Sequence, residues 1–164
     1  MRRITTVVAL LIVLTMVFSS NCKAAETPYI DYELYPYVED VCKKYNICPE
    51  LVAAQIYRES RWQPTIINDD GTTYGLMQIN PKYQQERMQR LGVTNLLDAR
   101  QNILVGVDYL SELISISEGD VYLTLMLYNM KHSSANKQFN AGNYSDYATE
   151  TCTLAESFER SHGK

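Results

Sequence analysis

Most of the chain beyond residue 26 repeats apolar side chains every three or four positions, the spacing that gives an α-helix one buried face. Proline, aspartate or asparagine opens several of these segments and glycine follows several of them, as is typical of helix boundaries. The predicted helices run from 38 to about 46, from 49 to about 61, from 81 to 92, from 98 to about 119 and from 121 to 130, and a last helix contains position 147 and ends at 163.

Two connecting segments differ from the helices around them. Residues 66–80 contain Asn68-Asp69-Asp70-Gly71 and then Gly75, which predicts a turn-rich loop or a small hairpin. Residues 131–143 are polar and are predicted as a loop. The helix at 121–130 is apolar on almost every side and belongs in the centre of a domain. We therefore expect an all-α fold, a single compact bundle of about six helices.

The first 25 residues have the pattern of a secretory signal. Arg2 and Arg3 precede an apolar run over residues 4–18, and small and polar residues follow it. The run is short for a helix that spans a bilayer. We expect residues 1–25 to be a signal peptide that is cleaved, which sends the domain to the periplasm or the extracellular cell wall. An uncleaved anchor is the alternative.

The length of the chain indicates a single domain, and its charge argues against binding to nucleic acid or anionic membranes. The chain has 164 residues, enough for one domain with a real core, and its formal net charge is −4. Cleavage of the signal leaves 12 basic and 19 acidic side chains, a charge of −7. An acidic domain has no electrostatic reason to bind nucleic acid or an anionic membrane. Its grip on any polymer must come from a shaped groove.

The cysteines do not define a metal site. Cys42, Cys48 and Cys152 remain after cleavage, and outside the cytoplasm Cys42 and Cys48 could pair with each other or either could pair with Cys152. Histidine and acidic residues do not stand at zinc-like spacing around them, so we predict neither a metal nor a cofactor.

Glu59 is the acidic residue that the apolar pattern singles out. It follows Val52 by seven positions and Ile56 by three, so it continues the buried face of its helix. Burial and the negative end of the helix dipole both raise the pKa of a carboxyl group placed there. A carboxylic acid that stays protonated near neutral pH can protonate a glycosidic oxygen. The alternative is a side chain that turns into solvent at the helix end.

Several short motifs around Glu59 occur in a fixed order. They are Glu59-Ser60-Arg61-Trp62, Tyr74-Gly75-Leu76-Met77-Gln78-Ile79-Asn80-Pro81, Asn102-Ile103 with Gly106 and Tyr109-Leu110, and Leu127-Tyr128-Asn129, and a helix bearing Tyr147 follows them. This ordered set resembles the soluble lytic transglycosylase family, cell-wall enzymes with a lysozyme-like fold. The likeness covers roughly residues 48–158. We therefore expect a catalytic domain over 48–160, preceded by a lead-in and first helix over 26–47.

The resemblance implies roles for residues of the first two motifs. Glu59 would be the catalytic acid and base. Ser60 would steady the Glu59 carboxyl group or the bound sugar, and a helix-end cap is the alternative. Gln78 would hydrogen-bond the substrate and Met77 would line the groove. Gly75 would bring the backbone close to the sugar or adopt a positive φ.

Later motifs complete the implied site. Tyr128 and Asn129 would form the wall opposite Glu59. Tyr147 would place its hydroxyl group near the reacting sugar, although its spacing also fits core packing. The family usually has Ala-Gly after its Tyr-Asn pair, whereas Met130-Lys131-His132 stands here. This departure leaves one edge of the groove undefined.

The resemblance also implies a reaction. Peptidoglycan glycan strands would be cut at the MurNAc–GlcNAc β-1,4 bond without water, leaving a 1,6-anhydro end. The first alternative is a lysozyme-type muramidase that uses Asp69 or Asp70 as a second carboxylate, although Asn-Asp-Asp-Gly is foremost a turn sequence. The second is a non-catalytic glycan-binding or envelope-assembly protein. Envelope or secretion-machinery proteins remain open as partners.

Overall fold

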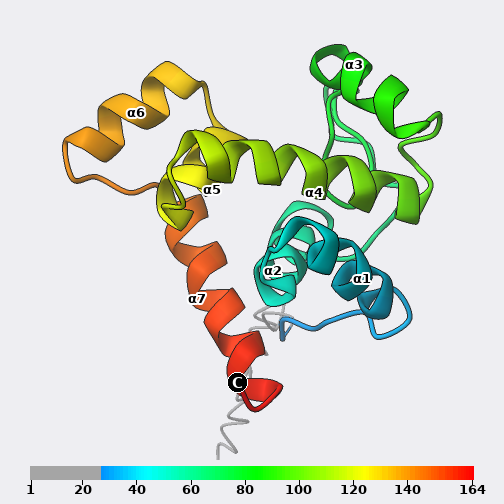
Figure 1. Ribbon diagram of the computed structural model, residues 1–164, viewed down its shortest axis with the longest axis horizontal. Helices are drawn as coiled ribbons and strands as arrows, with labels where there is room; N and C mark the ends of the chain where they lie inside the picture. Colours follow the sequence, from blue (N-terminus) through cyan, green and yellow to red (C-terminus); the bar gives the residue numbers. More distant parts are fainter. Residues whose placement is uncertain (1–26) are drawn as a thin grey trace, which may run out of the picture.

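A computed structural model describes residues 27–164, so the signal-peptide prediction for residues 1–25 lies outside the described residues. The described residues form seven helices (Figure 1): α1 Tyr35–Tyr45, α2 Pro49–Ser60, α3 Pro81–Leu91, α4 Ala99–Ile116, α5 Val121–Asn129, α6 His132–Asn140 and α7 Asp146–Ser161. The predicted all-α class is confirmed. None of the helices in this part of the chain is long and apolar enough to cross a membrane.

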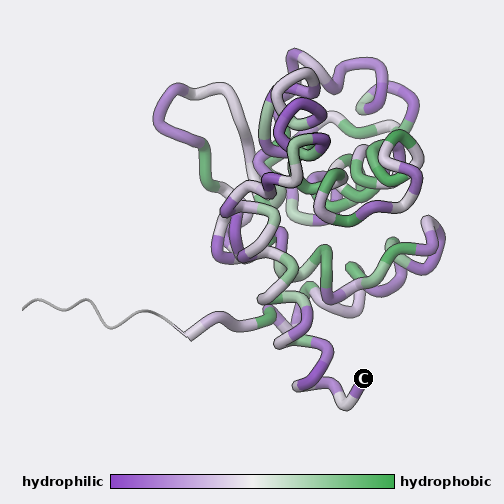
Figure 2. Tube along the Cα trace, turned by 90° about the vertical axis from the view of Figure 1, so that its left-hand side faces the viewer, coloured by the Kyte–Doolittle hydropathy of each residue, from purple (hydrophilic) through white to green (hydrophobic). Residues whose placement is uncertain are grey.

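Helix α4 is the longest element, and α1, α3 and α5 pack against it (Figure 1). Helix α2 packs between α1 and α7, and α5 packs on α7 as well. Fully buried side chains such as Ile56, Leu110 and Leu125 fill the space between these helices. Figure 2 shows the apolar residues mainly within this helical body, whereas the C-terminal end of the chain is largely hydrophilic.

Most helices begin and end where the sequence predicts. The side chains of Asn80, Asp98 and Asp120 each accept a hydrogen bond from a backbone N–H in the first turn of α3, α4 and α5. Gly92 ends α3 in a left-handed conformation, with φ of 68°. These capping bonds fix the boundaries of the three helices that surround the loop at 66–80.

The prediction of a loop over residues 131–143 is wrong, because helix α6 occupies most of it. Ala135 is its one buried residue, so no apolar stripe could reveal it in the sequence. The helix projects from the body in Figure 1 and packs on α5. Its Phe139 ring contacts Tyr144, and Tyr144 contacts Tyr122 of α5.

The segment at 66–80 is the turn-rich hairpin that its glycines and aspartates predict. Tyr74 forms isolated antiparallel bridges with both Ile67 and Ile79. The fully buried Asn102 of α4 anchors this segment, because its Nδ2 donates to Tyr74 O over 2.8 Å and its Oδ1 accepts from Met77 N over 2.8 Å. The amide side chain of Asn102 therefore attaches the hairpin to α4.

Candidate active site

Glu59 lies in the last turn of α2, where it lines an open pocket of about 340 Å³. It continues the face of α2 that carries the fully buried Val52 and Ile56, as the spacing predicts. The helix ends directly after Ser60, and Arg61 and Trp62 then adopt left-handed backbone angles with φ of 50° and 61°. The acid therefore sits at the rim of the core.

Tyr147 of α7 donates a hydrogen bond from Oη to Oε1 of Glu59 over 2.6 Å. Burial raises the pKa of Glu59 above its ordinary value of 4.5, although the hydrogen bond from Tyr147 and the positive charge of Arg58 act in the opposite direction. Arg58 also forms an ion pair with Glu150, at 2.5 Å. The pocket thus contains a carboxyl group whose protonated form persists to a higher pH than in water.

Gln78 lines the same pocket from the hairpin, together with Asn68 and Thr73. Its backbone has a positive φ of 47°. Thr73 Oγ1 donates to Gln78 Oε1 over 2.7 Å, and Gln78 Nε2 donates to Gly75 O over 2.9 Å. These bonds fix the side-chain amide at the edge of the pocket.

Gly75 has the expected positive φ, 73°. A Cβ atom there would lie 2.3 Å from Leu96 O and 2.4 Å from Nδ2 of Asn102, which is too close for any side chain. Glycine is therefore required here because the backbone of residue 75 lies close to Leu96 and Asn102 of the protein itself, and not because it lies close to the pocket.

The structure corrects two of the expected contacts. The side chain of Met77 is fully buried and lies against Gly106, so it does not line the groove. Ser60 is also buried, and its Oγ donates to Ile56 O over 3.1 Å rather than to Glu59. Ser60 therefore has the helix-end role. Met77 is adjacent to Gln78, and Ser60 is adjacent to Glu59, and both of these neighbours line the pocket. The motifs alone therefore do not show that the side chains of Met77 and Ser60 point away from it.

Tyr128 and Asn129, at the end of α5, line the pocket with Glu59. The hydroxyl group of Tyr128 donates to Met77 O over 2.8 Å, which joins α5 to the hairpin. The ring of Tyr128 also packs against Tyr109 of α4, with ring centroids 5.2 Å apart. The two residues thus lie where the resemblance implies, with Tyr128 held by contacts on two sides.

The pocket continues into a longer groove along Tyr128. Next to it lies a pocket of about 220 Å³ that shares Thr73, Gln78 and Tyr128 with it. A further pocket of about 610 Å³ shares Tyr128 and Asn129 and reaches the start of α6. The sequence assigned no site role to several groove residues, which are Asn68, Thr73, Ile79, Asn80, Tyr83, Gln84, Arg87, Tyr109, Glu112, Leu127, Met130, Lys131 and His132. Of these, Ile79, Asn80, Tyr109 and Leu127 belong to the motifs of the resemblance, and residues 130–132 form the segment that departs from it.

Glu59 is the one carboxylate among the residues that line its pocket. Asp69 and Asp70 are exposed in the hairpin turn and are not part of that lining. Asp70 Oδ1 accepts hydrogen bonds from the backbone N–H of Thr72 over 3.0 Å and from its hydroxyl group over 2.5 Å. This geometry is that of a turn-forming aspartate.

The sequence matches the family model of the Transglycosylase SLT domain over residues 36–150, most of the chain. The chain belongs to this family. Among curated relatives of the SLT domain, membrane-bound lytic murein transglycosylase F of Pseudomonas syringae pv. syringae (strain B728a) is 39% identical over 94 residues, which cover 54% of this chain and 18% of the relative. The protein of that name from Salmonella typhi is 32% identical over 106 residues, which cover 60% of this chain and 21% of the relative. This SLT domain therefore spans about a fifth of the length of the curated relatives it matches.

Solved structures share the fold of this SLT domain. An inactive mutant of lytic transglycosylase Slt from Pseudomonas aeruginosa superposes with a TM-score of 0.69 at 18% identity, covering 78% of this chain and 24% of that one. The 70 kDa soluble lytic transglycosylase from Escherichia coli gives a TM-score of 0.65 at 20% identity, covering 77% of this chain and 24% of that one. At this level of identity the likeness establishes the fold.

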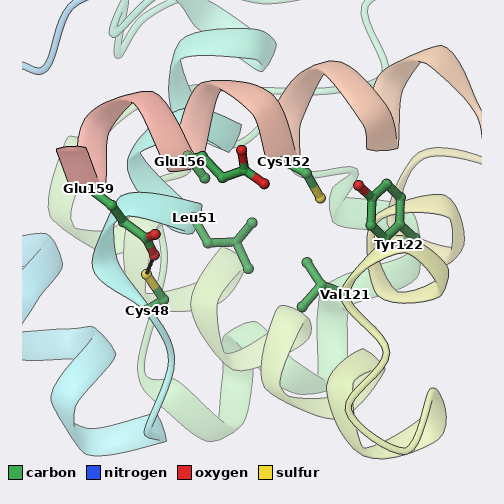
Figure 3. Close-up of a pocket in the computed structure, with 8 residues that line it drawn as sticks. Cys48, Leu51, Val121, Tyr122, Cys152, Glu156 and Glu159 are labelled. Atoms are coloured by element: carbon green, nitrogen blue, oxygen red, sulfur yellow. Dashed lines mark hydrogen bonds between the residues drawn. The ribbon is translucent and has the colours of Figure 1, made fainter. Parts of the chain in front are cut away.

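A second pocket of the SLT domain, of about 250 Å³, shares no lining residue with the groove (Figure 3). Leu51 and Val121 form its apolar floor, and Cys48, Cys152 and Glu159 lie around it. Cys48 Sγ donates to Glu159 Oε1 over 3.2 Å. Because Glu159 lies about two helical turns from Cys152 on α7, this contact holds the Cys48 thiol away from that of Cys152.

Cys48 and Glu159 also lie near the buried Glu50, and potential ligand atoms of the three residues lie within 4.8 Å of one another. No motif predicts this cluster, because Glu159 is more than a hundred residues from the other two in the sequence. The Glu50 carboxylate already accepts hydrogen bonds from Lys164 Nζ over 2.7 Å and from Tyr35 Oη over 3.0 Å. The protein itself thus supplies a positive charge to the most buried carboxylate of the cluster, and we assign no metal to it.

Proposed function

We propose that this SLT domain is an exported lytic transglycosylase that cuts the glycan strands of peptidoglycan at the MurNAc–GlcNAc β-1,4 bond and leaves a 1,6-anhydro end. The observation that carries the proposal is the carboxyl group of Glu59, which has a raised pKa and is the one carboxyl group that lines its pocket in the elongated groove. The curated relatives are named lytic murein transglycosylases, which supports the same chemistry for this chain. The secretory pattern of residues 1–25 supports export.

The first step is protonation of the glycosidic oxygen by Glu59. Because Tyr147 donates its proton to Oε1, the acid proton of Glu59 sits on Oε2. Oε2 transfers this proton to the oxygen that links MurNAc to GlcNAc, and the bond between that oxygen and the anomeric carbon of MurNAc breaks. The N-acetyl group of MurNAc then stabilises the positive charge at the anomeric carbon.

The second step closes the anhydro ring. The Glu59 carboxylate takes the proton from the 6-hydroxyl group of the same MurNAc, whose oxygen bonds to the anomeric carbon. Glu59 is then protonated again and no water has been consumed. One carboxyl group serves both proton transfers because its raised pKa lies closer to the working pH than that of an exposed glutamate.

The rest of the groove binds the strand. Gln78 presents its side-chain amide beside Glu59, and Tyr128, Tyr109 and Tyr83 offer aromatic faces along the groove. Aromatic faces and hydroxyl groups suit sugar rings, which have apolar faces and polar rims. This explains how a chain of formal charge −4 can hold an anionic wall polymer without long-range attraction.

Mass analysis of the fragments released from purified peptidoglycan tests the proposal. We expect wild-type protein to release anhydro-muropeptides and Glu59→Gln to release none. The exposed Glu39→Gln on α1 is the matched control and should behave as wild type. Products heavier by one water would instead indicate a muramidase, and their loss in Asp69→Asn or Asp70→Asn would identify its second carboxylate. Full activity of Glu59→Gln would reject Glu59 as the acid, and an inactive wild type would favour the non-catalytic glycan-binding alternative.

A further inference from the structure

Gln55 carries a polar side chain in the middle of the interface between α2 and α7. It is fully buried, and neither Nε2 nor Oε1 has a hydrogen-bond partner of ordinary geometry among the described residues. A buried amide without good partners destabilises a fold, and an apolar residue of similar size would avoid this cost. Such a side chain calls for a reason other than stability.

The position of Gln55 supplies that reason. It precedes Glu59 by four residues, one helical turn, so the two side chains lie on the same face of α2. Helix α7 packs along this face and carries Tyr147 (Figure 1). The fully buried Gln55 therefore lies one turn of α2 before the half-buried pair formed by Glu59 and Tyr147.

Electrostatics agree with a contact between Gln55 and Tyr147. Burial raises the pKa of Tyr147 well above its ordinary value, and the charge of Glu59 and the hydrogen bond to it raise it further. Gln55 acts in the opposite direction and lowers the pKa of Tyr147. This effect is that of a side-chain hydrogen-bond contact, so the Gln55 amide lies close to the Tyr147 hydroxyl group.

The hydroxyl group of Tyr147 has one proton and can direct it to only one acceptor. An amide N–H on its oxygen leaves that proton free for Oε1 of Glu59, the bond observed at 2.6 Å. If the amide oxygen of Gln55 faced the hydroxyl group instead, it would compete with Glu59 for the proton. The orientation of one buried amide thus controls which group Tyr147 serves.

We propose that Gln55 is a positioning residue for the catalytic acid: its side-chain N–H faces Tyr147 Oη and directs the hydroxyl proton to Oε1 of Glu59. This keeps the acid proton on Oε2, the oxygen from which it is transferred. The inference rests on the proposed function of Glu59.

The test is Gln55→Leu, with Gln55→Met as a second variant of closer shape. We expect kcat to fall on the order of tenfold, well short of the roughly 10²–10⁴-fold contribution of a general acid. KM should stay unchanged, because Gln55 does not line the groove. The temperature of unfolding should stay equal or rise, because the substitution removes unpaired buried polar atoms.

Thr124→Val is the matched control, because Thr124 is a fully buried polar residue whose hydroxyl group pairs with Ser117 Oγ at 2.6 Å, outside the groove. It should lower the temperature of unfolding and leave kcat unchanged, the opposite of the result expected for Gln55→Leu. The variant Gln55→Glu gives a further check. Its carboxylate accepts the proton of Tyr147, so the loss in kcat should be at least as large as in Gln55→Leu.

A double-mutant cycle decides whether Gln55 acts through Tyr147. In a Tyr147→Phe background, Gln55→Leu should cause little further loss. Wild-type kcat in both Gln55→Leu and Gln55→Met would overturn the inference, and so would a full tenfold loss in the Tyr147→Phe background. A fall in kcat accompanied by a lower temperature of unfolding in both variants would show a purely structural role. Retained activity in Glu59→Gln would contradict the proposed function separately from these outcomes.

Discussion

The hydroxyl group of Tyr147 lies 2.6 Å from Oε1 of Glu59 and donates its proton to it, which joins α7 to α2 across 88 positions of sequence. This bond marks one of the two carboxyl oxygens as an acceptor and leaves the other for the substrate. The same bond lowers the pKa of a carboxyl group that burial raises. Burial thus raises the pKa of Glu59, while the Tyr147 hydrogen bond and the charge of Arg58 lower it, and mutation of Tyr147 separates one of these effects from the others.

Activity should decline on the alkaline side as Glu59 ionises. In the proposed function the protonated form of Glu59 begins the reaction, and burial raises the pKa of Glu59 above 4.5. A profile of kcat/KM against pH for the wild type should therefore remain high at pH values where an exposed glutamate has already lost its proton. An alkaline limb centred near the ordinary value of 4.5 would contradict the role of Glu59 as the acid.

Tyr147→Phe should shift this alkaline limb to higher pH, because it removes a hydrogen bond that lowers the pKa of Glu59. The value of kcat should also fall, by about tenfold to a hundredfold, since the acid proton is no longer confined to Oε2. The profile of kcat/KM against pH measures both effects. The exposed Tyr32→Phe is the matched control, and its profile should coincide with that of the wild type.

Asn102→Ala should destabilise the hairpin. Asn102 makes three hydrogen bonds of 2.8 Å, with Tyr74 O, Leu96 O and Met77 N, and its removal takes away the side-chain partner of each of these backbone groups. We expect the free energy of unfolding to fall by about 3 kcal/mol in urea titrations. The exposed Asn136→Ala on α6 should leave it within about 0.5 kcal/mol of wild type.

Glu50 should contribute to stability at neutral pH and lose this contribution in acid. Burial alone would raise its pKa, but hydrogen bonds from Lys164 and His162 outweigh burial and hold the pKa at about 2. Because the folded-state pKa lies below the ordinary value of 4.5, the contribution is complete above that pH and disappears as pH falls towards 2. We expect Glu50→Gln to lower the free energy of unfolding at pH 7 by about 2–3 kcal/mol.

Urea titrations of both proteins between pH 7 and pH 2 measure this effect. The difference between wild type and Glu50→Gln should shrink steadily below pH 4.5. The exposed Glu86→Gln serves as the control with one fewer carboxyl group. A difference that stays constant down to pH 2 would mean that Glu50 contributes through packing rather than through its charge.

The sequence predicts the helices that have an apolar face and a capping residue, and it predicts the inward position of Glu59 from its spacing to Val52 and Ile56. It does not predict α6, because a helix with one buried residue leaves no periodic pattern. Nor does it predict that Met77 faces Gly106 while the neighbouring Gln78 faces the pocket. In a turn-rich segment with left-handed residues, the direction of each side chain depends on tertiary contacts rather than on a fixed repeat.

The residues of the candidate site likewise fall into those that the sequence predicts and those that only the structure reveals. Tyr128, Asn129 and Tyr147 lie near Glu59, and each is on or at the end of a helix that the sequence predicts, whereas their roles toward a sugar remain predictions. The sequence does not identify Asn68 and Thr73 as pocket residues. Asn68 begins Asn-Asp-Asp-Gly and Thr73 follows it, and turn formation is a sufficient explanation for that segment. The sequence does not predict the buried position of Gln55, because polar residues near a helix centre usually face solvent. Only the structure shows that its side chain is buried on the α7 side of α2.

Helix α6 begins where the groove ends and touches the rest of the molecule mainly through α5 and the ring of Tyr144. Its main packing partner is α5, whereas Glu59 and Tyr147 lie on α2 and α7. Under the proposed function, the length of strand that the groove holds and the proton transfers at Glu59 would therefore depend on different helices. Changes confined to the short polar helix α6 would then lengthen or shorten the groove without altering Glu59 or Tyr147.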